Sequence, residues 1–197
     1  MIITGKKIVL RDLVEADLPV YQGWLSNSHE WKKYDGPYYP LNESKVPENI
    51  GRLRQRIESS NWPEPRRSLV IADQATNGFV GLVSWYWESK ETNWLSVGIV
   101  IYDPAFWSGG IGYEALGLWS DYLLTVMPEL VRLGLATWSG NVRMMRLAEK
   151  LGYQEEARRR KARIVDGEYY DSMGYGVLRE EWEALYPQGF AALLRNE

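Results

Sequence analysis

The stretch that decides the fold is VGIVIYDPAFWSGGIGYEAL, residues 97–116, in which a strand-like run leads through a glycine-rich turn into a helix. Gly109, Gly110 and Gly112 stand directly before that helix. The first turn of a helix carries backbone N–H groups without intrahelical partners, and the helix dipole adds positive charge there. The turn therefore predicts an anion site, where glycine lets a pyrophosphate approach the backbone. A flexible turn before a helix is the alternative.

On either side of this stretch the chain alternates between strand-like and helix-like segments. Short turns separate strand-like runs at 68–72, 79–87 and 94–102, which predicts an antiparallel meander. A strand at 7–11, a helix at 15–26 and helical spacing at 50–57 come before them, and the loop at 27–45 shows no regular pattern.

The C-terminal half predicts two helices and three strands before a last helical segment. The helix after the glycine turn ends before Pro128 and is followed by a strand at 130–138. Asn141 is the expected N-cap of a helix that ends before Gly152. Strands at 157–165 and 169–178 flank an Asp166-Gly167 turn, and a helical segment follows at 180–185.

Together these segments predict one domain, residues 1–197, of mixed α/β (α+β) class. Its sheet is expected to be mostly antiparallel and flanked by helices. If the strands at 94–102 and 130–138 are parallel, the helix between them is the crossover, and its N-terminus lies at the carboxyl end of the sheet.

Composition excludes several classes of protein. Hydrophobic residues make up 45% of the 197 residues, and no apolar run reaches the ~18 residues of a membrane helix. A net charge of −3 gives no general attraction for nucleic acid. The absence of cysteine and the single histidine, His29, disfavour thiolate chemistry and metal sites. The first residues lack a secretory signal, so we expect a cytoplasmic protein with no membrane or nucleic-acid partner and no metal.

Five basic residues follow one another along the strand predicted at 157–165. They are Arg158, Arg159, Arg160, Lys161 and Arg163. Such a cluster is typical of an exposed strand face, and contact with an acidic partner or a cofactor phosphate is the alternative.

The glycine turn also fits the dinucleotide-binding pattern G-x-G-x-x-A at residues 110–115. Its surroundings differ from that motif, because residues 103–108 separate the turn from the preceding strand. The strand after the helix also lacks the acidic residue that holds a ribose. A nicotinamide-dependent oxidoreductase is therefore disfavoured.

Three blocks of the sequence resemble one family when taken in order. The first is the stretch at 97–116, the second is NVRMMRLAEKLGY at 141–153, and the third is DGEYYD at 166–171 with Tyr175, Leu178 and Glu181-Trp182. The chain resembles the GNAT superfamily of N-acetyltransferases, and within it the Rim-type branch of ribosomal-protein N-terminal acetyltransferases and their small-molecule relatives. The resemblance covers nearly the whole chain.

This resemblance implies a sheet that splays between its fourth and fifth strands, with acetyl-CoA as co-substrate in the cleft. Backbone groups of the fourth strand would pair with the pantetheine arm, and the glycine turn would hold the pyrophosphate. The cofactor-binding residues implied are Ile99, Val100, Ile101, Tyr102, Trp107, Ser108, Gly109, Gly110, Ile111, Gly112, Tyr113, Asn141 and Met144. Gly109 stands where the branch carries Lys or Arg, and Met144 where serine is common.

The catalytic groups are less well marked. The resemblance implies a backbone N–H near Ile99 or Val100 as donor to the oxyanion. Ser96 and Ala148 occupy the positions where many members carry a carboxylate base and a tyrosine acid. Asn141 and Ser96 are the catalytic candidates, and Asp103 and Asp35 are the carboxylates left as an alternative base.

The acceptor is expected to be a small-molecule amine or a peptide N-terminus. Trp31, Tyr34, Tyr38 and Tyr39, in the loop at 27–45, are the predicted acceptor-binding residues, because aromatic rings give large rigid contacts. A GNAT-like module that binds acyl-CoA without turnover is the alternative function. Both monomer and homodimer remain open.

Overall fold

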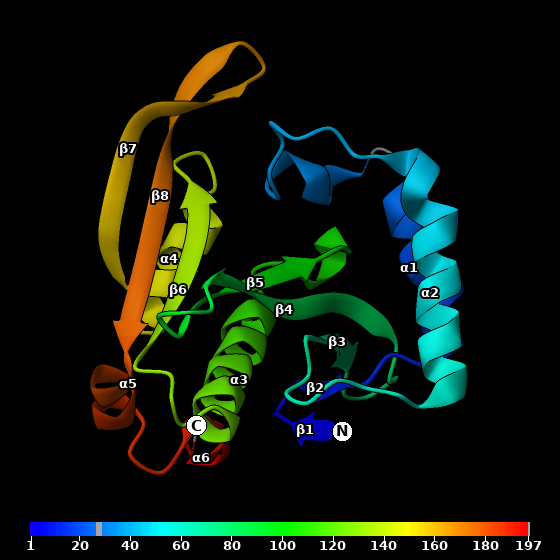
Figure 1. Cartoon of the computed structure of the whole chain (residues 1–197), viewed down its shortest axis with the longest axis horizontal. Coiled ribbons are helices and arrows are strands. Elements are labelled where there is room, and N and C mark those ends of the chain that lie inside the picture. Colours follow the sequence, from blue (N-terminus) through cyan, green and yellow to red (C-terminus); the bar gives the residue numbers. More distant parts are fainter. Residues whose placement is uncertain (27–28, 197) are drawn as a thin grey trace.

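The computed structural model describes residues 1–26 and 29–196 (Figure 1). Within these residues, eight strands form one sheet in the order β1-β2-β3-β4-β5-β6-β8-β7. All neighbouring strands are antiparallel except β5 and β6, which are parallel. The strands are β1 (Ile2–Thr4), β2 (Ile8–Arg11), β3 (Ser68–Asp73), β4 (Phe79–Ser89), β5 (Trp94–Ile101), β6 (Arg132–Trp138), β7 (Gln154–Val165) and β8 (Glu168–Leu178).

Helices cover both faces of this sheet. The helices of the described residues are α1 (Asp17–Ser26), α2 (Val46–Ser59), α3 (Ile111–Val126), α4 (Val142–Lys150), α5 (Arg179–Leu185) and α6 (Phe190–Asn196), with short 3-10 turns η1 (Glu30–Lys33), η2 (Glu43–Lys45) and η3 (Pro104–Phe106). Along β3, Leu69 and Ile71 join the core of α3, whereas Val70 and Ala72 pack with α1 and α2. This alternation follows from the two-residue period of a strand. None of the helices in the described segments is long and apolar enough to cross a membrane.

The parallel strands β5 and β6 part soon after they meet. Their only paired residues are Leu95 with Leu133 and Ser96 with Gly134, in the register of the described sheet. A Cβ on Gly134 would lie 2.8 Å from the Ser96 hydroxyl, so glycine permits the close approach at this point. Beyond it, β5 continues to Ile101 and β6 to Trp138 without a partner between them.

Helix α3 is the crossover between these two strands, as predicted. It starts at the carboxyl end of β5, and its buried face carries Leu116, Trp119 and Leu123, each at 0% exposure. Figure 1 shows α1 and α2 at one end of the sheet and the long β7–β8 hairpin at the other. The prediction of a mostly antiparallel mixed sheet flanked by helices is confirmed.

The ends of some helices and strands differ from the predicted ones, mainly where the backbone of polar residues forms strand hydrogen bonds. β7 starts at Gln154 rather than at 157, because backbone bonds to β8 extend it through charged residues. The short β1 and α6 were not predicted from the sequence. The loop predicted at 27–45 contains η1 and η2, and two of its residues, Asn27 and Ser28, lie outside the described residues.

Candidate active site

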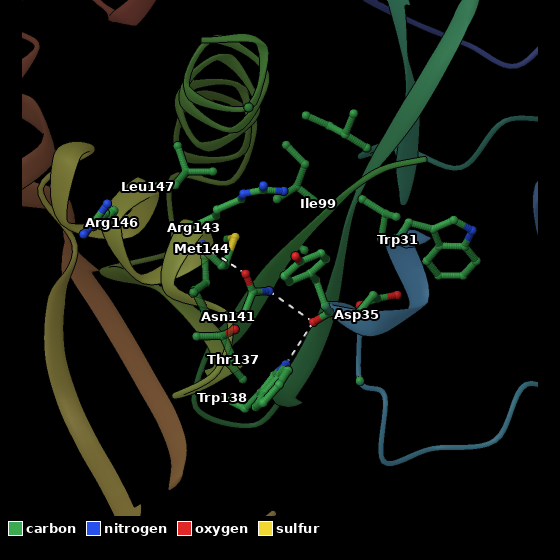
Figure 2. Close-up of a pocket in the computed structure, with 18 of the residues that line it drawn as sticks. Trp31, Asp35, Ile99, Thr137, Trp138, Asn141, Arg143, Met144, Arg146 and Leu147 are labelled. Atoms are coloured by element: carbon green, nitrogen blue, oxygen red, sulfur yellow. Dashed lines mark hydrogen bonds between the residues drawn. The ribbon is translucent and has the colours of Figure 1, made fainter. Parts of the chain in front are cut away.

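A cavity of about 760 Å³ opens between β5 and β6, beyond the point where the strands part. Three parts of the chain line it: the edges of the two strands, the glycine turn with α4, and the segment at 31–39. Tyr86 of β4 and Arg163 of β7 complete the lining. In Figure 2, Trp31 and Asp35 lie on one side of this cavity, and Asn141, Arg143 and Met144 lie on the other.

The β5 wall presents backbone groups to the cavity in a fixed order. The N–H of Tyr102 donates to the carbonyl of Val80 on β4 at 3.0 Å. Along an antiparallel strand, the backbone N–H and C=O of one residue point to one side and those of the next residue point to the other side. The backbone groups of Val100 therefore also point to β4, and those of Ile99 and Ile101 point to the cavity side. The carbonyl of Ile101 accepts from the Trp107 indole Nε1 at 2.9 Å. The N–H groups of Ile99 and Ile101 are therefore aimed between the strands.

The glycine turn leads the chain into α3 with its amides pointing outward. Gly110 is the N-cap of α3 and has φ +85°, a conformation that suits glycine. The first intrahelical bond runs from the N–H of Glu114 to the Gly110 carbonyl at 3.1 Å, which leaves the amides at 111–113 without a partner in the helix. A Cβ on Gly112 would lie 3.3 Å from Leu147 of α4, so the turn also permits close helix packing. These features fit a pyrophosphate.

Cations lie beside the glycine turn and along the rest of the cavity. Lys7, which precedes β2, donates from Nζ to the carbonyl of Gly109 at 2.7 Å, beside the position that lacks the expected cation. On α4, Lys150 Nζ lies 4.2 Å from the centre of the Tyr113 ring. Among the described lining residues, the cations are Arg143, Arg146, Lys150 and Arg163, and the carboxylate is Asp35. This balance of charge favours an anionic ligand.

One backbone carbonyl joins the two sides of the cavity. The carbonyl of Tyr34 accepts from Trp138 Nε1 at 3.0 Å and from Asn141 Nδ2 at 3.1 Å (Figure 2). The guanidinium of Arg143 lies 5.2 Å from the Tyr34 ring centre and 4.8 Å from that of Trp107. These two hydrogen bonds and the stacking of Arg143 hold the segment at 31–39 against β6 and α4.

Asn141 uses both ends of its side-chain amide. Its Oδ1 accepts from the N–H of Met144 at 3.2 Å, which makes it the N-cap of α4 as predicted. Its Nδ2 is the donor to Tyr34 described above. Asn141 therefore couples the start of α4 to the segment that carries the predicted acceptor-binding residues.

Asp35 brings a carboxylate into the cavity just after η1. Asp35 is exposed at the surface of the cavity, and the protein around the cavity partly desolvates its carboxylate. This desolvation raises the pKa of Asp35. The other remaining carboxylate, Asp103, accepts from the N–H of Ala105 at 2.9 Å as the N-cap of η3 and does not line the cavity.

Most of the residues predicted for binding line this one cavity. Those predicted to bind the cofactor are Ile99, Val100, Ile101, Trp107, Ser108, Gly110, Gly112, Tyr113, Asn141 and Met144, and those predicted to bind the acceptor are Trp31, Tyr34, Tyr38 and Tyr39. The structure thus brings the two predicted groups together, although they are far apart in the sequence.

Four predicted residues lie outside the cavity lining. Ser96, 3% exposed, sits where β5 and β6 still pair, and its hydroxyl donates to Glu88 Oε1 at 2.8 Å. The ring of Tyr102 is buried against Trp31 and other aromatic rings. Ile111 is in the core, and Gly109 and Ile111 border a second, smaller hollow beside Lys7. Ser96 thus has a position suited to holding the strands rather than to contact with a ligand.

Sequence reasoning did not assign several lining residues to the site. Strand and helix periodicity place Thr137 and Leu147 in the cavity lining only once the parallel pairing of β5 and β6 is known. Arg163 was expected on an exposed strand face, but the structure shows it half-buried and lining the cavity. β-bulges shift the register of β7 between Arg159 and Arg163, which a regular alternation could not anticipate.

Comparisons with known proteins agree with this geometry. The family model "Acetyltransferase (GNAT) domain" matches residues 7–154. The SPbeta prophage-derived uncharacterized N-acetyltransferase YokL of Bacillus subtilis (strain 168) is 22% identical over 186 residues, which are 91% of this chain and 94% of YokL.

Two solved structures share the fold. One is spermidine N-acetyltransferase from Vibrio cholerae in complex with CoA and spermine, with a TM-score of 0.70, 20% identity, and 89% of this chain and 98% of that chain covered. The other is RimL, the ribosomal L7/L12 α-N-protein acetyltransferase in complex with coenzyme A, with a TM-score of 0.69, 16% identity, and 90% and 98% covered. The family model spans well over half of the sequence. The chain therefore belongs to the GNAT family and is an acetyl-CoA-dependent acetyltransferase.

Proposed function

We propose that this protein transfers the acetyl group of acetyl-CoA to a primary amine by direct attack within a ternary complex. The observation that carries the proposal is one continuous cavity that runs from the glycine turn, along the unpaired edge of β5, to Asp35 and its aromatic neighbours. Its cations and outward amides suit the phosphates, and a strand edge suits the pantetheine arm.

In the proposed reaction a C–N bond forms between the amine nitrogen and the acetyl carbonyl carbon, and the C–S bond breaks. The amine must lose a proton, because an amine with a pKa of ~10 is mostly charged at neutral pH. We assign this proton to Asp35, whose raised pKa suits a base better than that of an ordinary aspartate. The N–H of Ile99, rather than that of Val100, is the proposed donor to the oxyanion.

Of the residues considered from the sequence, we propose Asp35, and not the catalytic candidate Ser96, as the residue that takes the proton. Ser96 is held by Glu88 at the junction of the strands, whereas Asp35 lines the cavity. Asn141 is proposed as a positioning residue, since its amide is engaged with Tyr34 and Met144.

The Rim-type branch remains part of the proposal. It is supported by the three sequence blocks and by the RimL structure among the neighbours. A peptide N-terminus and a small amine both fit this assignment as acceptors, since the neighbours named above act on one or the other.

A second function is an acyl-CoA-binding module without turnover. Serine at 96 and alanine at 148, in place of the family's usual acid and base groups, favour it. Measurement of free CoA with a thiol reagent separates the two, because the chain has no cysteine to give background. Amine-dependent CoA release would support the enzyme, whereas tight acetyl-CoA binding with no release across amines and peptides would support the module.

A further inference from the structure

Two opposite charges line the acceptor side of the cavity without pairing with each other. Asp35 follows η1, and Arg163 reaches the cavity from β7. No ion pair joins either side chain to a residue in the described parts of the chain. Asp35 is exposed at the cavity and Arg163 is half-buried in its wall. Each therefore presents an unpaired charge that a ligand in the cavity could meet, and pairing would offset the cost of partly desolvating it.

Arg163 is fixed in place but has unused hydrogen-bonding capacity. Its guanidinium carbon lies 4.7 Å from the centre of the Tyr38 ring, and its Nη1 donates to the carbonyl of Ala162 at 2.9 Å. Its Nε is buried and has no hydrogen-bond partner among the described residues. Stacking on Tyr38 thus orients a guanidinium whose remaining donors match a carboxylate or a phosphate.

Tyr38, which contacts Arg163, belongs to the same segment as Asp35. Two residues lie between Asp35 and Tyr38 in sequence, and the segment is anchored by the bonds to the Tyr34 carbonyl. The Tyr38 ring also contacts that of Tyr39, with ring centres 4.8 Å apart. The acceptor side therefore offers a carboxylate, an aromatic wall and a guanidinium in succession.

We propose that the acceptor is a primary amine that also carries an anionic group, a carboxylate or a phosphate, with the amine at Asp35 and the anion at Arg163. This inference rests on the proposed function and names its substrate class. In the reaction, the ammonium first gives one proton to Asp35, and the neutral nitrogen then bonds to the acetyl carbon as the C–S bond breaks. The second nitrogen proton goes to the sulfur, so that CoA leaves as the thiol. Arg163 takes no part in bond making and acts as a specificity-determining residue.

The test compares pairs of amines that differ in the anionic group. The pairs are β-alanine with β-alaninamide, phosphoethanolamine with ethanolamine, and a dipeptide with its C-terminal amide. For at least one anion type, we expect kcat/KM for the anionic member to exceed that of its neutral partner by about tenfold or more, as a charge-assisted contact predicts. The pair that shows the preference distinguishes a phosphate from a carboxylate.

Arg163→Gln should remove this preference by raising KM for the anionic member while sparing the neutral one. Arg163→Lys should keep part of it, since the charge remains. Arg160→Gln is the matched control, because Arg160 is an exposed arginine on the same strand and does not line the cavity. It should keep the wild-type preference. A thermal melt checks that each variant is folded.

Distinct outcomes overturn the inference and the proposed function. If neutral amines react as well as anionic ones, or if Arg163→Gln affects both members equally, the inference fails and the acetyltransferase activity stands. If Arg163→Gln instead weakens acetyl-CoA binding, Arg163 belongs to the co-substrate and the inference also fails. If folded protein that binds acetyl-CoA releases no CoA with any amine, the proposed function fails, and this inference with it.

Discussion

The two ends of the cavity differ in the groups that line them: main-chain amides at one end and side chains at the other. At the glycine turn, the groups proposed to face the co-substrate are main-chain amides at 111–113, and the conformation is set by residues that follow one another in sequence. At the proposed acceptor end, the groups are the side chains of Asp35, Tyr38 and Arg163, which come from a loop and from a distant hairpin. One end is a local motif, and the other exists only after the chain has folded.

This difference explains why a family can keep its co-substrate while it changes its acceptor. A site made of backbone groups tolerates many side chains, provided that glycine remains where the chain needs it. A site made of side chains changes with each substitution. If the two ends are as separate as their construction suggests, a substitution at one end should leave binding at the other unchanged.

The largest effect is expected at Asp35. Asp35→Asn keeps the shape but cannot accept a proton, and we expect kcat/KM for the amine to fall by ~10²–10⁴-fold, the range for loss of a general base. Acetyl-CoA affinity should stay near the wild-type value, measured by calorimetric titration. Asp103→Asn is the matched control, since Asp103 does not line the cavity. Equal losses in the two variants would remove Asp35 from its proposed role.

The dependence of activity on pH tests the same role of Asp35 as a base. Because the pKa of Asp35 is raised, its basic form is lost at a higher pH than for an ordinary aspartate. Activity of the wild type should therefore fall as pH is lowered through this raised pKa, and the residual activity of Asp35→Asn should lack this acidic limb. An identical acidic limb in both proteins would assign it to another group.

The next effect is expected at the glycine turn. Gly110→Asp puts a carboxylate against the pyrophosphate, and we expect acetyl-CoA affinity to fall about a hundredfold, as like charges at close range predict. Gly167→Asp is a close control, because Gly167 in the β7–β8 turn has φ +84° against +85° for Gly110. Calorimetric titration should show normal affinity for Gly167→Asp. Normal affinity in folded Gly110→Asp would move the phosphates elsewhere.

A smaller effect is expected at Asn141, which links the two ends. Asn141→Ala removes both the N-cap and the bond to Tyr34, and we expect a loss of ~1 kcal/mol in the free energy of unfolding. Asn141→Ser keeps a capping oxygen but loses the donor to Tyr34, so stability should be nearly restored. Steady-state kinetics should still show a raised KM for the amine in the serine variant. An unchanged KM would mean that the tether does not position the acceptor side.

The smallest effect is a gain in stability. Folding raises the pKa of Asp35, so the folded protein holds the Asp35 proton more tightly than the unfolded chain, and stability falls as pH rises from the ordinary aspartate pKa through the raised one. At neutral pH the ionised carboxylate is therefore a cost, which Asp35→Asn removes. A thermal melt at neutral pH should show a slightly higher Tm for the variant, and the difference should vanish at low pH. A lower Tm at neutral pH would contradict the desolvation of Asp35.

The same division governs what could be predicted from the sequence. The crossover of α3, the role of Asn141 as N-cap and the outward amides of the glycine turn depend on local patterns, and the structure contains all three. Short links predicted the antiparallel meander of β3, β4 and β5, whereas the position of β8 between β6 and β7 was not predicted. The predicted features need only the neighbours of each residue in the chain.

Features that depend on distant contacts could not be derived in this way. Alignment placed Ser96 where many members have a base, but the hydroxyl is engaged by Glu88 at the strand junction. Arg163 was placed on an exposed face, because its position depends on bulges in β7 and on Tyr38. Lys7 reaches Gly109 across 102 residues of sequence, so a cation missing from the motif is supplied from elsewhere.

The most direct measurement is amide hydrogen exchange along β5, with and without acetyl-CoA. If the edge of β5 beyond Ser96 holds the arm of the co-substrate, the N–H of Ile99, which faces the cavity, should gain protection when acetyl-CoA is added. The N–H of Val100, which faces β4, should be protected already and change little. Protection that appears at Val100 and not at Ile99, or at neither residue while acetyl-CoA is bound, would contradict this placement.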